Sequence, residues 1–92
     1  MSKYKIFETE QFQEDLNRIS RNIRNKVIKK IKDHVYIQLE KNPYFGSNIK
    51  KLKNYIPETW RYRIGNYRLF YEINDKEKIV FLIGLEIRKD AY

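Results

Sequence analysis

The feature that most restricts the fold is a pair of alternating segments that meet at Gly65-Asn66. These two residues are typical of a two-residue β-hairpin turn. The flanking segments, Thr59–Ile64 and Tyr67–Ile73, alternate in side-chain character as strands do. The sequence therefore predicts an antiparallel hairpin whose register is set by the length of its turn.

The N-terminal half has helical periodicity instead. Residues 3–8 alternate loosely and predict a short strand, and Thr9 is a suitable N-cap for a helix that follows it. A second helix is expected from Asn22 to about Lys41. Its apolar stripe recurs at helical spacing and consists of Val27, Ile28, Ile31, Val35 and Leu39. The basic residues of this helix lie mostly on its opposite, solvated side, and His34, at the edge of the stripe, is expected to pack.

Two further strands complete the prediction. Ile49 to Leu52 is either a short strand or an edge segment. Ile79–Leu85 is apolar throughout, which predicts a central strand covered on both faces. The expected fold is α+β: a short N-terminal strand, a two-helix hairpin and an antiparallel β-meander, with the helices packed on one face of the sheet.

Composition limits the classes of partner and site that the protein can have. The 92 residues allow one domain, and 20 Lys and Arg against 12 Asp and Glu give a net charge of +8. Such a charge predicts a polyanionic partner, with nucleic acid ahead of acidic lipid, and the alternative is a solubilising surface. There is no cysteine and one histidine, which excludes a disulfide scaffold and a thiolate or multi-histidine metal site. No cofactor is expected. With no membrane-spanning run and no signal peptide, the protein is expected to be cytoplasmic.

The hairpin register gathers arginines on one face. It places Arg63 opposite Arg68, with Arg61 on the same face, and like charges directly opposite each other are destabilising. An anion between them would relieve the repulsion.

The next strand returns to bring Arg88 near Arg68, with Tyr92 one turn later. The preceding segment brings three lysines: Lys50, Lys51 and Lys53. Arginine binds phosphate bidentately and tyrosine stacks on bases, so the cluster predicts an anion-binding site, with nucleic acid as the first candidate ligand. The alternative is a surface face paired with Glu58, Glu72 and Glu86.

The order of elements, the segment Tyr62–Tyr71 and the ending Ile87–Tyr92 resemble the RelE/ParE superfamily of bacterial and archaeal toxins. The resemblance covers nearly the whole chain. It implies that Arg61 and Arg63 occupy the two RelE lysine positions, that Arg68 and Arg88 match its catalytic arginines, and that Tyr92 matches its C-terminal tyrosine. The chain departs from many relatives in carrying Arg at both lysine positions and Glu86-Ile87 where they have Gly-His.

RelE-type members are ribosome-dependent mRNA endoribonucleases held inactive by an antitoxin. The resemblance therefore implies a metal-independent mRNA interferase that cleaves by attack of an RNA 2′-hydroxyl on the adjacent phosphate. Arg63 and Arg68 would hold the phosphate, Arg88 would stabilise the leaving oxygen, and Tyr92 would orient the 2′-hydroxyl or stack on a base. The general base stays open between Tyr92 and Glu86.

Two alternatives stay open. ParE-type members on the same fold poison DNA gyrase and lack the nuclease residues, and a plain nucleic-acid-binding module comes third. For either toxin the expected partner is an acidic, partly disordered antitoxin, in a hetero-oligomer, that covers the arginine face and the apolar stripe of the second helix. The nuclease also implies the ribosome and mRNA as partners.

Overall fold

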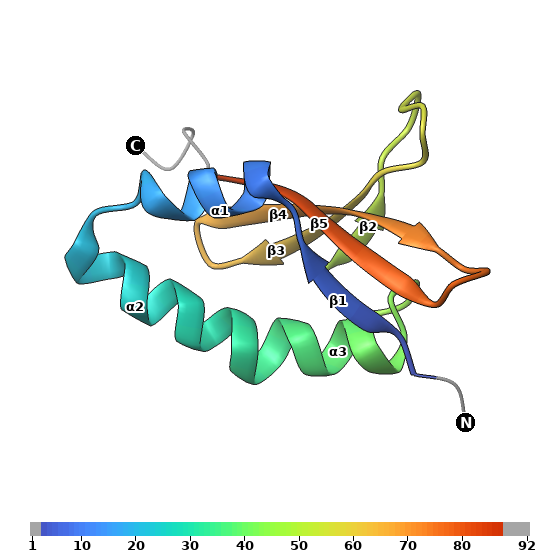
Figure 1. Ribbon diagram of the computed structural model, residues 1–92, viewed down its shortest axis with the longest axis horizontal. Helices are drawn as coiled ribbons and strands as arrows, with labels where there is room; N and C mark the ends of the chain where they lie inside the picture. The colour runs from blue at the N-terminus through green and yellow to red at the C-terminus, as the bar shows by residue number, and fades with distance from the viewer. Residues whose placement is uncertain (1–2, 88–92) are drawn as a thin grey trace.

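The computed structural model describes residues 3–87 (Figure 1). Its elements in chain order are β1 (Lys5–Glu8), α1 (Glu10–Asn17), α2 (Arg21–Lys30), a π-helical turn η1 (Ile31–Val35), α3 (Tyr36–Lys41), β2 (Ile49–Lys51), β3 (Trp60–Ile64), β4 (Tyr67–Asn74) and β5 (Ile79–Ile87). The strands form one sheet in the order β1-β5-β4-β3-β2. The predicted α+β class is confirmed, and the segment at residue 49 is a true edge strand.

The β3–β4 hairpin has the predicted register. Arg63 lies opposite Arg68 and Ile64 opposite Tyr67. Gly65 adopts φ +54°, which the first central position of a primed hairpin turn requires and which glycine takes without steric cost. Turn chemistry and alternation together were therefore sufficient to fix this half of the sheet.

The pairing of β4 with β5 contains a bulge. Phe70 pairs with Gly84 but Tyr71 pairs with Leu82, so Ile83 is an extra residue. Side chains alternate along a strand, so one extra residue reverses the faces beyond it. The bulge turns Leu85 into the core, where it is 6% exposed, and directs Glu86 outward.

The N-terminal strand pairs in parallel with β5, and α1 then continues along the same edge. Thr9 caps α1 as predicted, because its Oγ1 accepts from the Phe12 N–H at 3.3 Å. Beyond the end of β1 the edge of β5 is covered by α1. There the Asp15 carboxylate accepts from the backbone N–H of Leu85 at 2.9 Å. A sheet edge that would otherwise lack a partner is thus satisfied by a side chain.

The predicted second helix is one continuous rod, α2–η1–α3, that packs beneath the sheet in Figure 1. Four of the five predicted stripe residues, Val27, Ile31, Val35 and Leu39, are buried, and Ile28 is partly buried. Residues four apart advance about 40° further around an α-helix than a full turn, so this stripe would drift across the surface. The wider turn at η1 offsets that drift. His34, expected to pack, is instead exposed, because it lies on the outer side of this turn.

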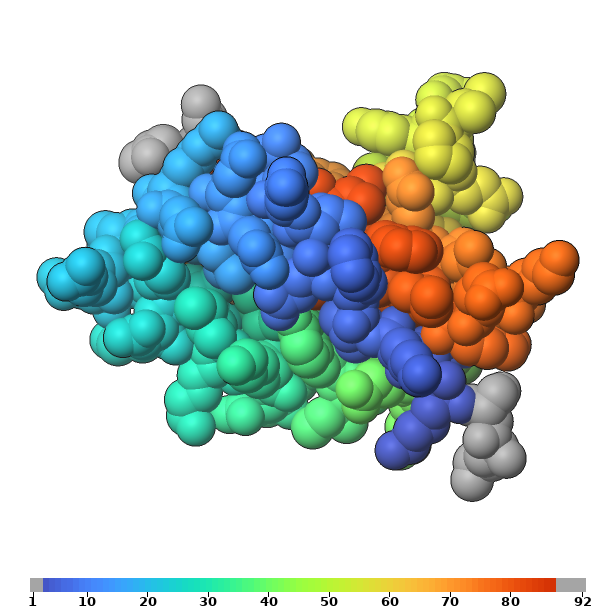
Figure 2. All heavy atoms as spheres, viewed as in Figure 1, coloured from blue at the N-terminus to red at the C-terminus, as the bar shows by residue number. Residues whose placement is uncertain are grey.

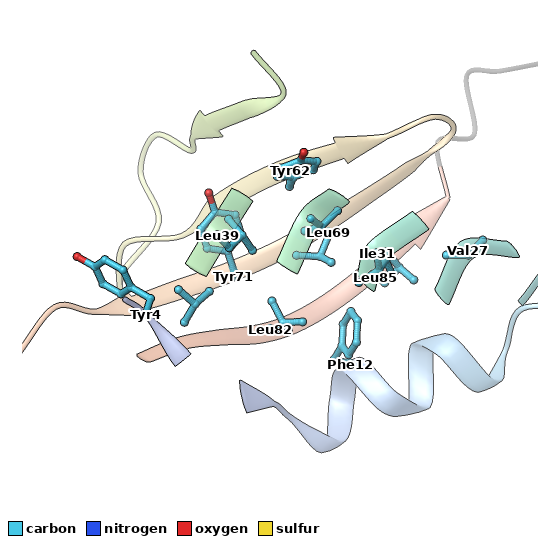
Figure 3. Close-up of a cluster of buried hydrophobic side chains, with 12 residues drawn as sticks. Tyr4, Phe12, Val27, Ile31, Leu39, Tyr62, Leu69, Tyr71, Leu82 and Leu85 are labelled. Carbon is cyan, nitrogen blue, oxygen red and sulfur yellow. The ribbon is translucent and has the colours of Figure 1, made fainter. Parts of the chain in front are cut away.

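The core lies between this rod and one face of the sheet. Figure 3 shows Tyr62, Leu69 and Tyr71 projecting from the sheet toward the helical segments that carry Ile31 and Leu39. The fully buried Tyr71 donates its hydroxyl to the Pro43 carbonyl at 2.7 Å. We call this side of the sheet the core face.

One expectation about β5 is wrong in part. The strand is internal, between β1 and β4, but only its core face is fully covered. Phe81 and Ile83 on the other face are half-buried, because no long helix packs there. None of the helices within residues 3–87 is long and apolar enough to cross a membrane.

Candidate nucleic-acid interface

The sheet surface opposite the core face carries the predicted arginines. In β3, Tyr62 is buried in the core, so its neighbours Arg61 and Arg63 point the other way. In β4, Leu69 is buried and Arg68 points outward. We call this side the arginine face. Arg63 is exposed, whereas Arg61 and Arg68 are partly buried.

A row of charged side chains crosses three strands of this face: Arg63 in β3, Arg68 in β4 and Glu86 in β5. We call it the arginine row. Arg63 lies opposite Arg68, and Arg68 lies opposite Glu86. The Arg68 Nη2 donates to Glu86 Oε1 at 2.7 Å. The predicted repulsion between the two arginines is therefore offset by a carboxylate of the chain itself, as the alternative interpretation expected for Glu86. Both partners are more than a third exposed, at 36% and 54%, so water screens the pair.

Arg68 keeps unused hydrogen-bonding capacity. Its Nε is buried and has no hydrogen-bond partner among the described residues. A buried donor left unsatisfied costs about 1–3 kcal/mol. The planar guanidinium is therefore held in place by Glu86 without all of its donors being used, and a bidentate acceptor such as phosphate matches its fork geometry.

The three lysines separate. Lys50 in β2 lies directly opposite Arg61, which places it on the arginine face. Lys51 lies opposite Trp60 and pairs with Glu58 at 3.1 Å, so it belongs to the other side of the edge strand. Lys53 is exposed in the loop of residues 52–59, which stands away from the sheet in Figure 1. The structure thus adds one lysine to the three arginines.

Arg88 and Tyr92 lie outside the described residues. The last described position, Ile87, pairs with Tyr67, next to the Arg68–Glu86 pair. Within the described residues, β5 therefore ends beside the Arg68–Glu86 pair.

A hollow of about 270 Å³ opens on the arginine face beside this row. Its lining is Tyr55, Thr59, Phe70, Ile83, Gly84 and Glu86. Residue patterns alone do not predict this hollow. The sequence does contain a signal, because pairing the hairpin from its two-residue turn places the aromatic Phe70 opposite Arg61, among the charged side chains.

A larger groove lies at the junction of the helices and the sheet. It has a volume of about 630 Å³ and apolar walls that include Ile19, Ile23 and Leu85, with Arg18 at its rim. Ile23 is 47% exposed. Among residues 3–87 no group of three or more His, Cys, Asp or Glu side chains is placed to hold a metal ion.

Comparison with known proteins places these features in a family. A family model described as the ParE toxin of type II toxin-antitoxin systems, parDE, matches residues 6–92. No curated protein sequence matches the chain.

Solved structures share the fold. The RelBE2 toxin–antitoxin complex from Mycobacterium tuberculosis is similar with a TM-score of 0.74 and 25% identity, over 96% of this chain and 94% of that chain. The archaeal RelE–RelB complex from Pyrococcus horikoshii OT3 has a TM-score of 0.65 and 21% identity, over 97% and 99%. The isolated E. coli RelE toxin has a TM-score of 0.64 and 20% identity, over 94% and 85%. The predicted RelE-like fold is confirmed.

Proposed function

The chain belongs to the ParE toxin family of type II toxin–antitoxin systems, within the RelE/ParE superfamily, and of the activities found in that superfamily we propose that it is an mRNA endoribonuclease acting in the ribosome. The observation that carries the proposal is the row of Arg63 and Arg68 on an open sheet face, with Arg61 and Lys50 beside it. Guanidinium groups that converge on a solvent-facing surface suit a phosphodiester rather than an apolar ligand.

In the proposed reaction an RNA 2′-hydroxyl loses its proton and its oxygen attacks the adjacent phosphorus. The bond from phosphorus to the 5′ oxygen breaks, and that oxygen takes up a proton. The products are a 2′,3′-cyclic phosphate and a free 5′-hydroxyl. Negative charge grows on the phosphate in the transition state, and fixed cations aimed at it are the main means of stabilisation.

Each residue of the site has a separate role in this reaction. Arg63 and Arg68 hold the phosphate from adjacent strands, about 5 Å apart in the sheet. Arg88 stabilises the leaving oxygen and Tyr92 orients the 2′-hydroxyl. The proton acceptor is Tyr92 or Glu86. The ribosome orders the mRNA against this surface, which is a proximity contribution.

The partner is a cognate antitoxin. The Mycobacterium tuberculosis and Pyrococcus horikoshii structures are toxin–antitoxin complexes, and the +8 charge favours an acidic segment. The expectation that the antitoxin covers the apolar stripe of the rod is wrong, because four of its five residues, Val27, Ile31, Val35 and Leu39, are buried in the protein's own core. The arginine face itself remains for the antitoxin to cover.

A gyrase poison is the second candidate, and the match to the ParE family model favours it. Substitutions in the arginine row distinguish the nuclease from the gyrase poison, because only the nuclease needs these arginines to cleave RNA.

The test is in vitro translation with mapping of mRNA 5′ ends, run beside a gyrase supercoiling assay. The nuclease proposal expects new mRNA ends that are lost in Arg68→Ala and retained in Arg21→Ala, an exposed arginine outside the row. Inhibited supercoiling with intact mRNA would establish the gyrase alternative.

A further inference from the structure

The hollow beside the arginine row is the feature that the proposed phosphate chemistry leaves unused. Tyr55 from the 52–59 loop forms one wall, and Phe70 with Ile83 supplies apolar surface from the sheet. Figure 2 shows the side chains of this loop standing out from the body of the molecule. Tyr55 is 55% exposed, so its ring is available to a ligand.

The hollow results from local backbone geometry. The bulge at Ile83 places Gly84, which has no side chain, directly opposite Phe70. A Cβ at position 84 would lie 3.4 Å from Asp15 Oδ2 and 3.9 Å from Phe70 Cδ2, so the glycine leaves that position empty beside the ring. Half-buried aromatic surface is thereby kept open on a face that no long helix covers.

The hollow and the arginine row are neighbours. Phe70 lies opposite Arg61 and follows Arg68 by two residues on the same strand face. Glu86 belongs to both, because it lines the hollow and accepts from Arg68 at 2.7 Å. A ligand in the hollow would therefore have an anion-binding fork within about 7 Å, two strand residues away.

The hollow and the arginine row together match the two parts of a nucleotide, a base and a phosphate. A flat aromatic group between a tyrosine and a phenylalanine gains stacking energy, and a phosphate next to it meets guanidinium groups. A base and its phosphate are separated by one ribose. At about 270 Å³ the hollow is smaller than the ~300–1,000 Å³ of pockets that take drug-sized ligands, which suits a single base.

We propose that the hollow formed by Tyr55, Phe70 and Gly84 binds the nucleobase next to the phosphate held by the arginine row, and so contributes to the choice of cleavage site. The inference rests on the proposed function. It makes Tyr55 a residue that touches substrate without touching the reacting atoms. The neighbouring arginine row favours RNA over an apolar protein side chain, because RNA carries a phosphate next to each base.

The experiment measures binding of short single-stranded 2′-O-methyl RNA, which lacks the attacking hydroxyl, and of a matched oligonucleotide with abasic positions. Tyr55→Ala is expected to weaken RNA binding roughly tenfold and to leave abasic binding unchanged. The matched control is Ile56→Ala, whose side chain is 99% exposed and does not line the hollow, and it should bind both as the parent protein does.

The other outcomes separate this inference from the proposed function. Arg68→Ala should weaken both oligonucleotides, because both carry phosphates. If Tyr55→Ala binds RNA as the parent does while Arg68→Ala is impaired, the base site is overturned and the phosphate site stands. If Arg68→Ala also binds normally, the proposed function falls. If Tyr55→Ala weakens only antitoxin binding, the hollow belongs to the protein partner and the inference is overturned.

Discussion

The two faces of the sheet are built from alternate residues of the same strands, yet they differ in almost every physical property. On the core face Leu69, Tyr71 and Leu82 are fully buried. On the arginine face Arg63 is exposed and Arg68 is held by a solvent-screened ion pair. Burial stabilises the first face, whereas the second places like charges next to each other and contributes little to folding.

The comparison shows that stability and proposed function are separated by a single step along the chain. Leu69 and Arg68 are neighbours in sequence and point to opposite sides of β4. Substitutions at adjacent positions should therefore have unrelated consequences.

The largest effect on folding is expected at the core face. Leu69→Ala removes a fully buried side chain and leaves a cavity, which costs about 2–5 kcal/mol of unfolding free energy. Urea denaturation followed by circular dichroism measures the loss. A loss under about 1 kcal/mol would mean that the site collapses around the alanine and that the core is less tightly packed than described.

A substitution at the neighbouring Arg68 should affect activity and leave stability nearly unchanged. Arg68→Ala is expected to abolish toxicity while changing the unfolding free energy by no more than about 1 kcal/mol, because its ion pair is solvent-screened. Growth of cells that express the variant, with its level and melting curve measured in parallel, checks both parts. Growth arrest at the parental level of folded protein would contradict the assignment of the arginine row.

A smaller effect should follow from removing the resident carboxylate of the arginine face. Glu86→Gln takes one negative charge from the row and frees the Arg68 guanidinium, so affinity for non-cleavable RNA should rise about threefold to tenfold at low salt. A salt titration of binding is the measurement, with Glu14→Gln, an exposed carboxylate on α1, as the control. Unchanged affinity would show that Glu86 does not compete with phosphate for Arg68.

The smallest effect concerns the far end of the core face. Hydrogen bonds from Tyr4 and Tyr44 hold the pKa of Asp75 below its usual value. A carboxyl with a lowered folded-state pKa stabilises the protein above the unfolded pKa of about 3.9, and that contribution disappears as the pH falls through the folded value. Asp75→Asn should therefore reduce stability slightly at neutral pH and flatten its acid dependence below about pH 4. Melting temperatures of the two proteins across this range should converge; parallel curves would contradict the linkage.

The sequence predicted the arginine face because turn chemistry determines the hairpin register. Gly65-Asn66 leaves one way to pair β3 with β4, and Arg63 then meets Arg68. The partner of Arg68 on the other side was harder to predict. Counting back from the β4–β5 turn without a bulge would pair Arg68 with Leu85 and direct Glu86 inward. The extra residue at Ile83 shifts that register, and an apolar run gives no sign of where a bulge falls.

Other features depend on contacts between distant segments. The four residues of β1 carry no information about which strand they join or in which direction, so their parallel pairing with β5 was not anticipated. The hollow at Tyr55 depends on the path of an irregular loop, which residue patterns do not specify. The π-helical turn at η1 compensates for a drift that a helical wheel of five stripe residues does not show.

The pairing of β1 with β5 has a consequence for synthesis of the protein. Lys5 lies beside Ile79, and Glu8 beside Leu82, so the first strand has no partner until nearly the whole chain has left the ribosomal exit tunnel. Contacts between such distant positions also slow folding, because a long loop must close before they form. Each newly made molecule therefore passes through an interval in which β1 has no partner and the sheet is incomplete. A partner already present can meet the chain during that interval, before its sheet is complete.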